Sequence, residues 1–222
     1  MKKINFFSFC LLLTVGMATV VFNSCSKDDE DKKKDTLTYD EGVVINGVKW
    51  ATRNVAAPGT FAAKPEDAGM FYQWNRKVAW PATGSSVTDW DNSFPTGTLW
   101  EKANDPSPAG WHVPTSEEIN TLFDADKVTS EYLTINGIRC IKFTYKATGE
   151  NLFLPAAGYR NFSDGTLMHA GASGFYWSST PFEGEGYEWA ANYMYFYNIA
   201  AVWPGANRNN GFSVRCVSDE TE

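Results

Sequence analysis

Two Asn-Gly pairs, each flanked by apolar residues, place the strongest constraint on the fold. Asn46-Gly47 lies in VVINGVKW, and Asn136-Gly137 lies in LTINGIRCIKFTY. Asn-Gly readily adopts the left-handed conformations of a two-residue hairpin turn, so each pair predicts two antiparallel strands. A further hairpin is predicted in FTYKATGENLFLP, turning near Thr148-Gly149. The chain is therefore expected to contain antiparallel sheet, in a domain that begins near Tyr39.

Alternation with a period of two extends this expectation to the C-terminal half. In YEWAANYMYFYNIAAVW, alternate residues are predicted to share one face of a strand: Tyr187, Trp189, Ala191, Tyr193, Tyr195 and Tyr197. The closing segment NNGFSVRCV places Phe212, Val214 and Cys216 on one face in the same way. We therefore predict an antiparallel sheet there.

Helix is sparse in the sequence. Thr115 can cap a helix, with Glu118 three residues later completing a capping box, and Ile119, Leu122 and Phe123 form an apolar stripe. KPEDAGMFYQWN predicts a second short helix or a turn. Residues 77–109 are expected to be a long irregular region of the Ω-loop kind. The predicted class is α+β, mostly antiparallel strands with one or two short helices and long irregular loops.

The N-terminus has the pattern of a signal peptide. Lys2 and Lys3 precede an uncharged apolar run from Phe6 to Phe22. A membrane span is the alternative, but seventeen residues lie near the lower limit for one. Ser24-Cys25 and the polar run that follows resemble the lipidation site of a bacterial lipoprotein, although Phe22 and Asn23 depart from its usual box. We predict a signal peptide over 1–24 and a lipid on Cys25.

Residues 25–38 are expected to form a charged, disordered tether, because blocks of charge cannot bury apolar surface. The run Ser-Lys-Asp-Asp-Glu after Cys25 resembles the acidic export signal of surface lipoproteins in Bacteroides-like bacteria. The resemblance implies an outer-membrane protein that is lipid-anchored, exposed at the cell surface, and attached to the membrane through the lipid alone.

The charge balance argues against a nucleic-acid partner. The chain carries 19 basic and 26 acidic residues, and residues 1–24 contain two of the lysines and no acid, so the mature net charge is −9. No basic patch stands out.

Cys140 and Cys216 remain in the predicted domain, which spans residues 39–219. In an oxidising compartment they could pair, which would stabilise the fold by about 4 kcal/mol in the chain-entropy estimate. The alternative, that both are free and buried, stays open.

Six motifs in order now identify a family resemblance. They are VKWATRNV, AGMFYQWN, DPSPAGWHVPTSEE, FLPAAGYRN, GFYWSST and GFSVRCV. In this sequence they resemble the FISUMP domain, the Fibrobacter succinogenes major paralogous domain, over roughly residues 44–219. The resemblance implies a C-type-lectin-like fold that is related to formylglycine-generating-enzyme-like domains. Family members often have Cys where this chain has Ser107, which the resemblance pairs with the position of Cys216; the usual disulfide is therefore in doubt here.

His112 raises the question of catalysis or metal binding, because Glu117 and Glu118 follow it closely. The resemblance implies a scaffold role, with Trp111 in the core and His112 in a structural hydrogen bond. The only other histidine is His169, and two isolated histidines make no metal motif. We expect no enzyme activity, no cofactor and no bound metal, while calcium at Asp89, Asp91 and Asn92 remains an alternative.

The expected function is recognition of a glycan or a cell-surface protein. Trp90 and Trp203 lie in polar, loop-like stretches, and with Asp91 and Arg208 they are the predicted ligand-binding residues, since aromatic faces flanked by hydrogen-bonding groups suit sugars. A structural or adhesive subunit of a surface assembly is the alternative function, and an unrecognised hydrolase is a third. Trp111, Trp177 and Phe212 are predicted to be buried.

Overall fold

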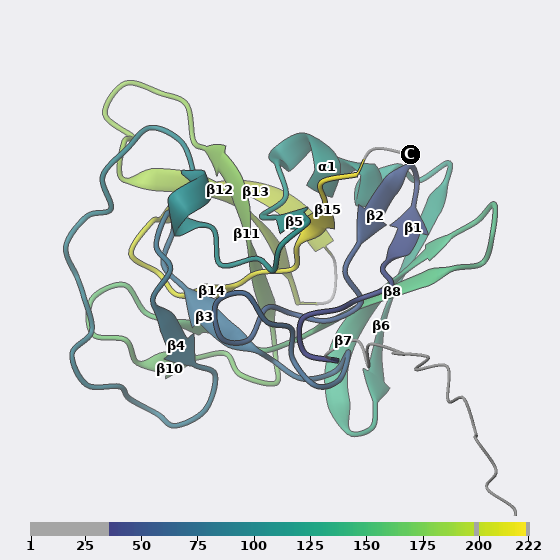
Figure 1. Ribbon diagram of the computed structural model, residues 1–222, viewed down its shortest axis with the longest axis horizontal. Coiled ribbons are helices and arrows are strands. Elements are labelled where there is room, and N and C mark those ends of the chain that lie inside the picture. The colour runs from purple at the N-terminus through teal and green to yellow at the C-terminus, as the bar shows by residue number, and fades with distance from the viewer. Residues whose placement is uncertain (1–35, 198–199, 221–222) are drawn as a thin grey trace, which may run out of the picture. The chain divides into compact units, whose positions relative to one another are not determined.

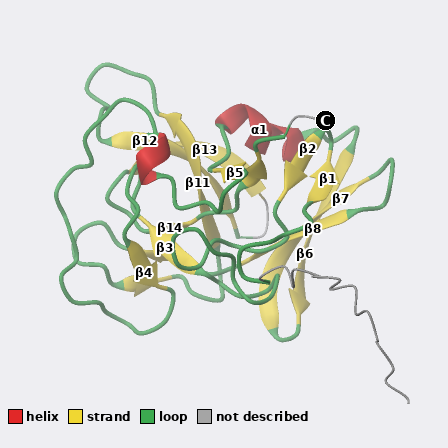
Figure 2. Ribbon diagram, in the orientation of Figure 1, coloured by secondary structure: helices red, strands yellow, loops and turns green. Residues whose placement is uncertain are grey.

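The computed structural model describes residues 36–197 and 200–220, with side chains omitted for 200–204 (Figure 1). The signal segment, Cys25, most of the tether and the side chain of Trp203 lie outside the described residues. Antiparallel strands dominate, together with one short α-helix and long loops (Figure 2). The mostly antiparallel expectation is confirmed. Among the described residues, no helix is long and apolar enough to cross a membrane.

A six-stranded sheet forms the centre, in the order β13-β12-β11-β14-β3-β4. Only the β11–β14 pair is parallel. Its strands are β3 (Met70–Tyr72), β4 (Ala79–Pro81), β11 (Gly174–Pro181), β12 (Ala190–Phe196), β13 (Ala200–Asn207) and β14 (Phe212–Ser213).

Three smaller sheets surround the centre. One has the order β1-β2-β15-β5, one is β6-β7-β8, and the third pairs β9 with β10. Their strands are β1 (Val43–Ile45), β2 (Val48–Trp50), β5 (Trp111–His112), β6 (Val128–Ile135), β7 (Ile138–Tyr145), β8 (Asn151–Pro155), β9 (Tyr159–Arg160), β10 (Leu167–Met168) and β15 (Val217–Ser218). The three predicted hairpins are confirmed as β1–β2, β6–β7 and β7–β8.

The only α-helix among the described residues is α1 (Ser116–Asn120), followed by the 3-10 turn Thr121–Phe123; a second 3-10 turn is Lys102–Asn104. The predicted capping box is confirmed, since Thr115 Oγ1 accepts from the Glu118 N–H while the Glu118 carboxylate accepts from the Thr115 N–H. Ile119 is buried against the central sheet. The helix therefore begins where its cap satisfies the free N–H groups.

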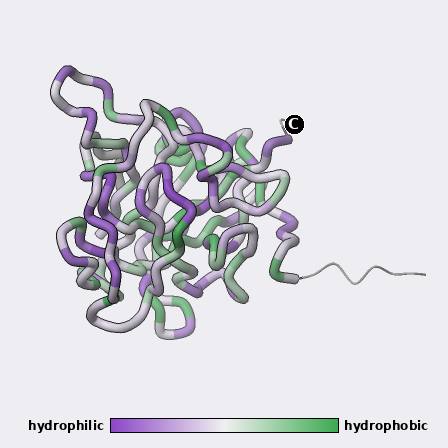
Figure 3. Tube along the Cα trace, turned by 60° about the vertical axis from the view of Figure 1, so that its left-hand side comes forward, coloured by the Kyte–Doolittle hydropathy of each residue, from purple (hydrophilic) through white to green (hydrophobic). Residues whose placement is uncertain are grey.

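Two cores lie on opposite faces of the central sheet, because successive strand residues point to opposite sides. Tyr176 belongs to the core shared with α1 and β6–β8, whereas Trp177 belongs to the core beneath the loops. Hydrophobic stretches, green in Figure 3, are accordingly spread along the whole described chain. Trp111, Trp177 and Phe212 are all buried, as predicted.

Two local predictions need correction. The helix alternative for residues 64–75 is wrong, because Met70–Tyr72 is a strand in which Phe71 and Tyr72 pair with both β14 and β4. The other alternative, a turn, is found at Pro65-Glu66. The alternating run is strand from Ala190 to Phe196 and again from Ala200, whereas Tyr187 and Trp189 precede β12 and belong to a loop. Ala191 and Tyr193 pack against the same core, as the alternation predicts, despite a bulge between them.

The sequence left open whether the two cysteines pair. Cys140, in β7, and Cys216, directly before β15, are both buried and free. The Cys140–Cys216 disulfide is therefore absent, and the alternative of two free, buried thiols is confirmed. Burial raises the pKa of the Cys216 thiol, and the nearby Ser107 hydroxyl acts in the opposite direction. Ser107 thus lies near Cys216, the two positions that the family resemblance pairs.

Candidate functional site

Two long loops form a groove on one side of the central sheet. Residues 82–101 connect β4 to the first 3-10 turn, and residues 182–189 connect β11 to β12; they lie at the left and upper left of Figure 1. Their side chains line a hollow of about 460 Å³ together with one residue after β13. We call this the loop groove; its lining is Phe94, Pro95, Gly97, Glu188, Trp189 and Arg208.

Aromatic side chains stand exposed at the rim of the loop groove. Phe94 is 58% exposed and Trp189 is 39% exposed. The indole N–H of Trp189 donates to the carbonyl of Gly186 at 3.1 Å, which fixes the ring in its loop. Exposed rings with a fixed orientation offer stacking faces at low entropic cost.

Arg208 supplies the polar floor of the loop groove. It is only 4% exposed, and its guanidinium lies 4.1 Å over the ring of Trp74. Its Nε donates to the Ala190 carbonyl at 2.9 Å and its Nη1 to the Gly97 carbonyl at 3.0 Å. A guanidinium has five N–H donors, so three have no acceptor among the described residues.

The other buried arginines differ in how fully their donors are paired. Arg215 makes two hydrogen bonds, and its Nη2 has no partner among the described residues. Arg160 is fully buried, and its guanidinium makes four hydrogen bonds to the carbonyls of Pro81, Thr83 and Gly165. Arg208 makes half as many and lines an open hollow. Arg208 therefore keeps donors available for something in the groove.

Acidic groups balance Arg208. Burial lowers the pKa of Arg208, and the charge of Glu188 acts against that shift. A neighbouring hollow of about 240 Å³ shares Gly97, Glu188 and Arg208 and adds Glu183. The groove thus presents cationic donors, carboxylate acceptors and aromatic faces together.

Of the predicted ligand residues, only Arg208 lines the loop groove. Trp90 is half-buried, with its ring 4.7 Å from Trp80 and its indole N–H donating to the Phe162 carbonyl. The Asp91 carboxylate is exposed but accepts from Ser93 and pairs with Arg76 at 2.6 Å. These contacts serve the local structure of the loop.

The two predicted stretches nevertheless meet. The Gln73 amide donates to the carbonyls of both Asp91 and Asn209, and the Asn209 amide donates to the Asn92 carbonyl. Trp203 lies in β13 opposite Tyr193, away from Trp90 in the strand order, and its side chain is outside the described set. Sequence reasoning missed Trp189 and Phe94; the acidic, glycine-rich run 183–188 before Trp189 was the available signal.

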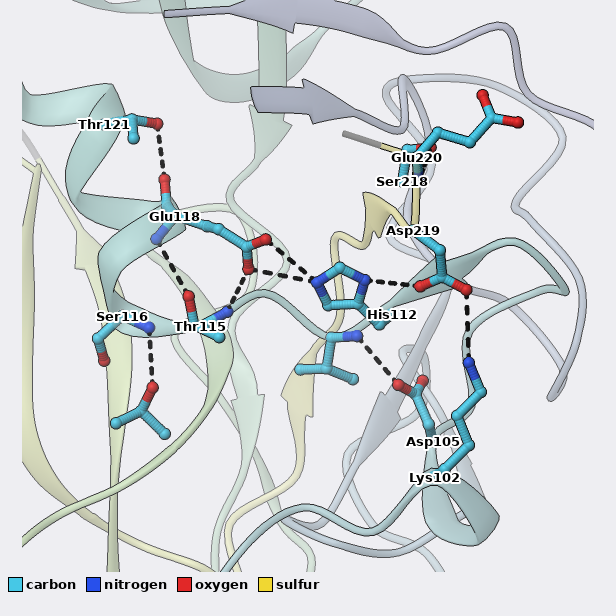
Figure 4. Close-up of polar contacts among 12 residues, drawn as sticks. Lys102, Asp105, His112, Thr115, Ser116, Glu118, Thr121, Ser218, Asp219 and Glu220 are labelled. Carbon is cyan, nitrogen blue, oxygen red and sulfur yellow. Dashed lines mark hydrogen bonds and ion pairs between the residues drawn. The ribbon is translucent and has the colours of Figure 1, made fainter. Parts of the chain in front are cut away.

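His112 is held in a clamp between two carboxylates (Figure 4). Its Nδ1 lies 2.8 Å from Asp219, and its Nε2 lies 3.2 Å from Glu118, which also accepts from the Thr115 N–H. The hydrogen bond to Glu118, with a further contribution from Asp219, raises the pKa of His112 against the effect of burial. Lys102 pairs with the other oxygen of Asp219 at 3.4 Å.

With both ring nitrogens engaged, His112 has no free lone pair to act as a base or a metal ligand in this arrangement. The clamp joins β5, the start of α1 and the end of the chain, as the structural hydrogen bond expected for His112 would. Among the described residues, no group of three or more His, Cys, Asp or Glu side chains could hold a metal ion.

Comparison with known proteins gives one match. The family model of the Fibrobacter succinogenes major domain matches residues 23–218. No curated protein and no solved structure matches the chain.

Proposed function

Because the chain belongs to the Fibrobacter succinogenes major domain family and this match names no ligand, we propose its function from the site itself. The domain recognises glycans without catalysing a reaction, and it binds them in the loop groove. The observation that carries the proposal is Arg208, a buried guanidinium with free donors beside the exposed ring of Trp189. A pyranose has an apolar C–H face that stacks on an aromatic ring and hydroxyls that both donate and accept.

The charges favour a neutral sugar. Hydroxyls can accept from Arg208 and donate to Glu188 at the same time, whereas an anionic sugar would meet the carboxylates of Glu183 and Glu188. The volume of about 460 Å³ lies within the range of about 300–1,000 Å³ for small-ligand sites.

Glycan-array binding of the purified protein tests this proposal, followed by titration of the best neutral ligand into variants. Trp189→Ala and Glu188→Ala change exposed side chains, so each should leave folding intact and weaken binding by about 1 kcal/mol or more. Phe162→Ala removes an exposed ring outside the groove and serves as the matched control. Unchanged affinity for Trp189→Ala and Glu188→Ala would place binding elsewhere.

We propose that the protein is an outer-membrane lipoprotein exposed at the cell surface. The support is the apolar signal ending at Ser24-Cys25 and the acidic tether that follows. Cys25→Ala should lose a labelled palmitate and release the protein from the membrane fraction. Membrane retention at unchanged mass would refute lipidation of Cys25, and protease treatment of whole cells tests surface exposure.

We also propose the C-type-lectin-like fold as the finer architecture. What supports it is the combination of a short helix, small antiparallel sheets and long loops gathered at one side (Figure 1). An experimental structure whose strand order cannot be superposed on that of C-type-lectin-like domains would reject it.

An assembly subunit is the second candidate function, and one observation favours it. β6 is eight residues long, and among the described strands it pairs with β7 alone, so its other edge could accept a strand from another chain. Light scattering across a range of protein concentrations tests this, and a monomer throughout would argue against it.

A further inference from the structure

A second recessed surface lies over the central sheet, away from the residues that line the loop groove. It is lined by five aromatic side chains and encloses about 330 Å³. We call it the aromatic hollow; its lining is Tyr159, His169, Phe175, Tyr193 and Tyr195. Tyr159 comes from β9, and His169 comes from the segment that follows β10. Phe175 comes from β11, and Tyr193 and Tyr195 come from β12, so segments far apart in sequence build one surface.

The rings follow one another as a continuous strip. The ring centres of His169 and Tyr159 are 5.9 Å apart with planes only 13° from parallel, and Tyr159 is 4.6 Å from Phe175. Phe175 is in turn 6.3 Å from Tyr193, with planes 11° from parallel, and 5.0 Å from Tyr195. Neighbouring rings are therefore about one sugar ring apart, and the strip is longer than a single sugar ring.

The strip rests on a rigid base. Phe212 contacts Tyr159, Phe175 and Tyr193 at 5.7, 5.3 and 5.2 Å between ring centres. Phe212 itself stacks on the buried Trp177 at 4.2 Å. Rings held from below need little reorganisation when a ligand binds, which lowers the entropic cost of binding.

The lining of the aromatic hollow disfavours a charged ligand. Among the described residues, its lining has no acidic side chain, no lysine and no arginine, and it offers the phenol hydroxyls of Tyr159 and Tyr193 and the imidazole of His169. Burial raises the pKa of the Tyr193 hydroxyl, so this group stays protonated at neutral pH and can donate as well as accept. The hollow differs from the loop groove in this respect, because the groove places a cation and carboxylates around its ligand.

We propose that the aromatic hollow is a second binding site, which takes a neutral oligosaccharide of two or more flat sugar rings. The C–H faces of successive sugars stack on the aromatic strip, and the hydroxyls along their edges pair with the phenols. This site stands on its own contacts and does not require that the loop groove binds a glycan.

Titration of the purified full-length protein with the β-1,4-linked glucose hexamer tests the proposal, because its equatorial hydroxyls leave flat C–H faces. Tyr193→Ala should weaken binding about fivefold or more, whereas Tyr193→Phe keeps the ring, loses only the hydroxyl, and should weaken binding less than Tyr193→Ala does. His169→Asn is the second variant: His169 has φ +56°, and Asn tolerates this conformation while removing the ring. Thermal unfolding of each variant confirms that it is folded.

Two controls and the groove variant Trp189→Ala accompany the titration. A hexamer of galacturonic acid has similar length but carries carboxylates, and should not compete at the concentrations where the glucose hexamer saturates. Phe162→Ala changes an exposed ring that lines neither surface, and should bind the glucose hexamer like the parent. If binding is lost only in Trp189→Ala, the second site is refuted while the loop groove stands. If the hexamer does not bind, or if Tyr193→Ala and His169→Asn both bind normally, the proposal is overturned.

Discussion

The loop groove and the aromatic hollow are supported in different ways. The hollow is built mainly on strands, and its rings stand on Phe212 and Trp177 within a core. The groove is built on loops, and the 82–101 loop is held by individual side chains that reach its backbone carbonyls.

Side chains from two short segments, residues 73–76 and 208–209, hold the C-terminal part of the 82–101 loop, whereas Arg160 donates to the Thr83 carbonyl near its start. Asn75 donates to the Thr96 carbonyl at 2.9 Å and accepts from the Glu101 N–H at 2.8 Å. Arg76 donates to the Ser93 carbonyl, and Asn209 donates to the Asn92 carbonyl, both at 2.8 Å. Buried polar groups need hydrogen-bond partners, and these bonds provide them both for the loop backbone and for the side chains that hold it.

Because they are supported differently, the two surfaces should be sensitive to different substitutions. A strand-built surface shares its stability with a whole core, so its loss requires a large packing defect. The 82–101 loop depends on a few hydrogen bonds, so substitution of one Asn or Gln side chain can make the loop more mobile while the sheets remain folded.

The largest effect is expected for Phe212→Ala, beneath the hollow. Replacing a buried phenylalanine by alanine costs about 3–5 kcal/mol, out of an ordinary stability of about 5–15 kcal/mol. Denaturant unfolding measures the loss. Phe94→Ala, at the exposed rim of the groove, is the matched control and should change stability by about 0.5 kcal/mol or less. Equal losses in the two variants would break the contrast between core-supported and loop-supported surfaces.

A disulfide between positions 107 and 216 should raise the free energy of unfolding without changing the aromatic hollow. The Ser107 hydroxyl is buried near Cys216, so Ser107→Cys is expected to form the bond under oxidising conditions. Closing a loop of roughly 110 residues should stabilise by about 2–4 kcal/mol. Unfolding with and without reductant measures this, and the Cys216→Ser double variant is the control. A free thiol titre that stays unchanged would show that the two positions do not meet.

Removing the Asn75 side chain tests directly whether hydrogen bonds hold the 82–101 loop. Asn75→Ala deletes three hydrogen bonds, to Thr96, Glu101 and Asn104, and should cost about 2–4 kcal/mol. Asn75 has φ +56°, which alanine tolerates poorly, so Asn75→Gly separates hydrogen-bond loss from backbone strain and should cost less. Amide exchange in residues 91–101 should accelerate in both variants. Unchanged exchange there would mean that the loop is held by packing.

The His112 clamp contributes to neither surface and predicts the smallest effect. Its carboxylate partners raise the pKa of His112, so the stability it adds is fully present below about pH 6.5 and is lost as the pH rises through the folded-state value. Part exposure limits the change to about 1 kcal/mol or less. Unfolding at pH 6 and pH 8.5 should show this difference in the parent and not in His112→Gln. A parent that is more stable at pH 8.5 would contradict the clamp.

The sequence predicted the parts of the fold that local chemistry determines. Asn46-Gly47 and Asn136-Gly137 specify their turns through backbone conformation, and Thr115 with Glu118 specifies a helix start through its N–H groups. Each signal lies within a few residues, so no tertiary information is needed. The family was also recognisable, because it rests on ordered motifs.

The candidate sites depended on contacts between distant residues. Arg208 was predicted as a ligand residue, but its burial over Trp74 and its nearness to Trp189 and Phe94 come from tertiary packing. Tyr193 and Tyr195 were correctly placed on one face, yet their partners Tyr159 and His169 lie on another sheet and the segment after it. Polar neighbours in sequence also misled the expectation for Trp90, which packs on Trp80.

Hydrogen–deuterium exchange of the protein saturated with its best neutral glycan tests the central claim most directly. Binding in the loop groove should slow amide exchange in peptides covering residues 94–98 and 183–189, and Trp189→Ala should abolish that protection at the same glycan concentration. Saturated protein in which those peptides exchange at the unliganded rate would show that the groove is not the glycan site.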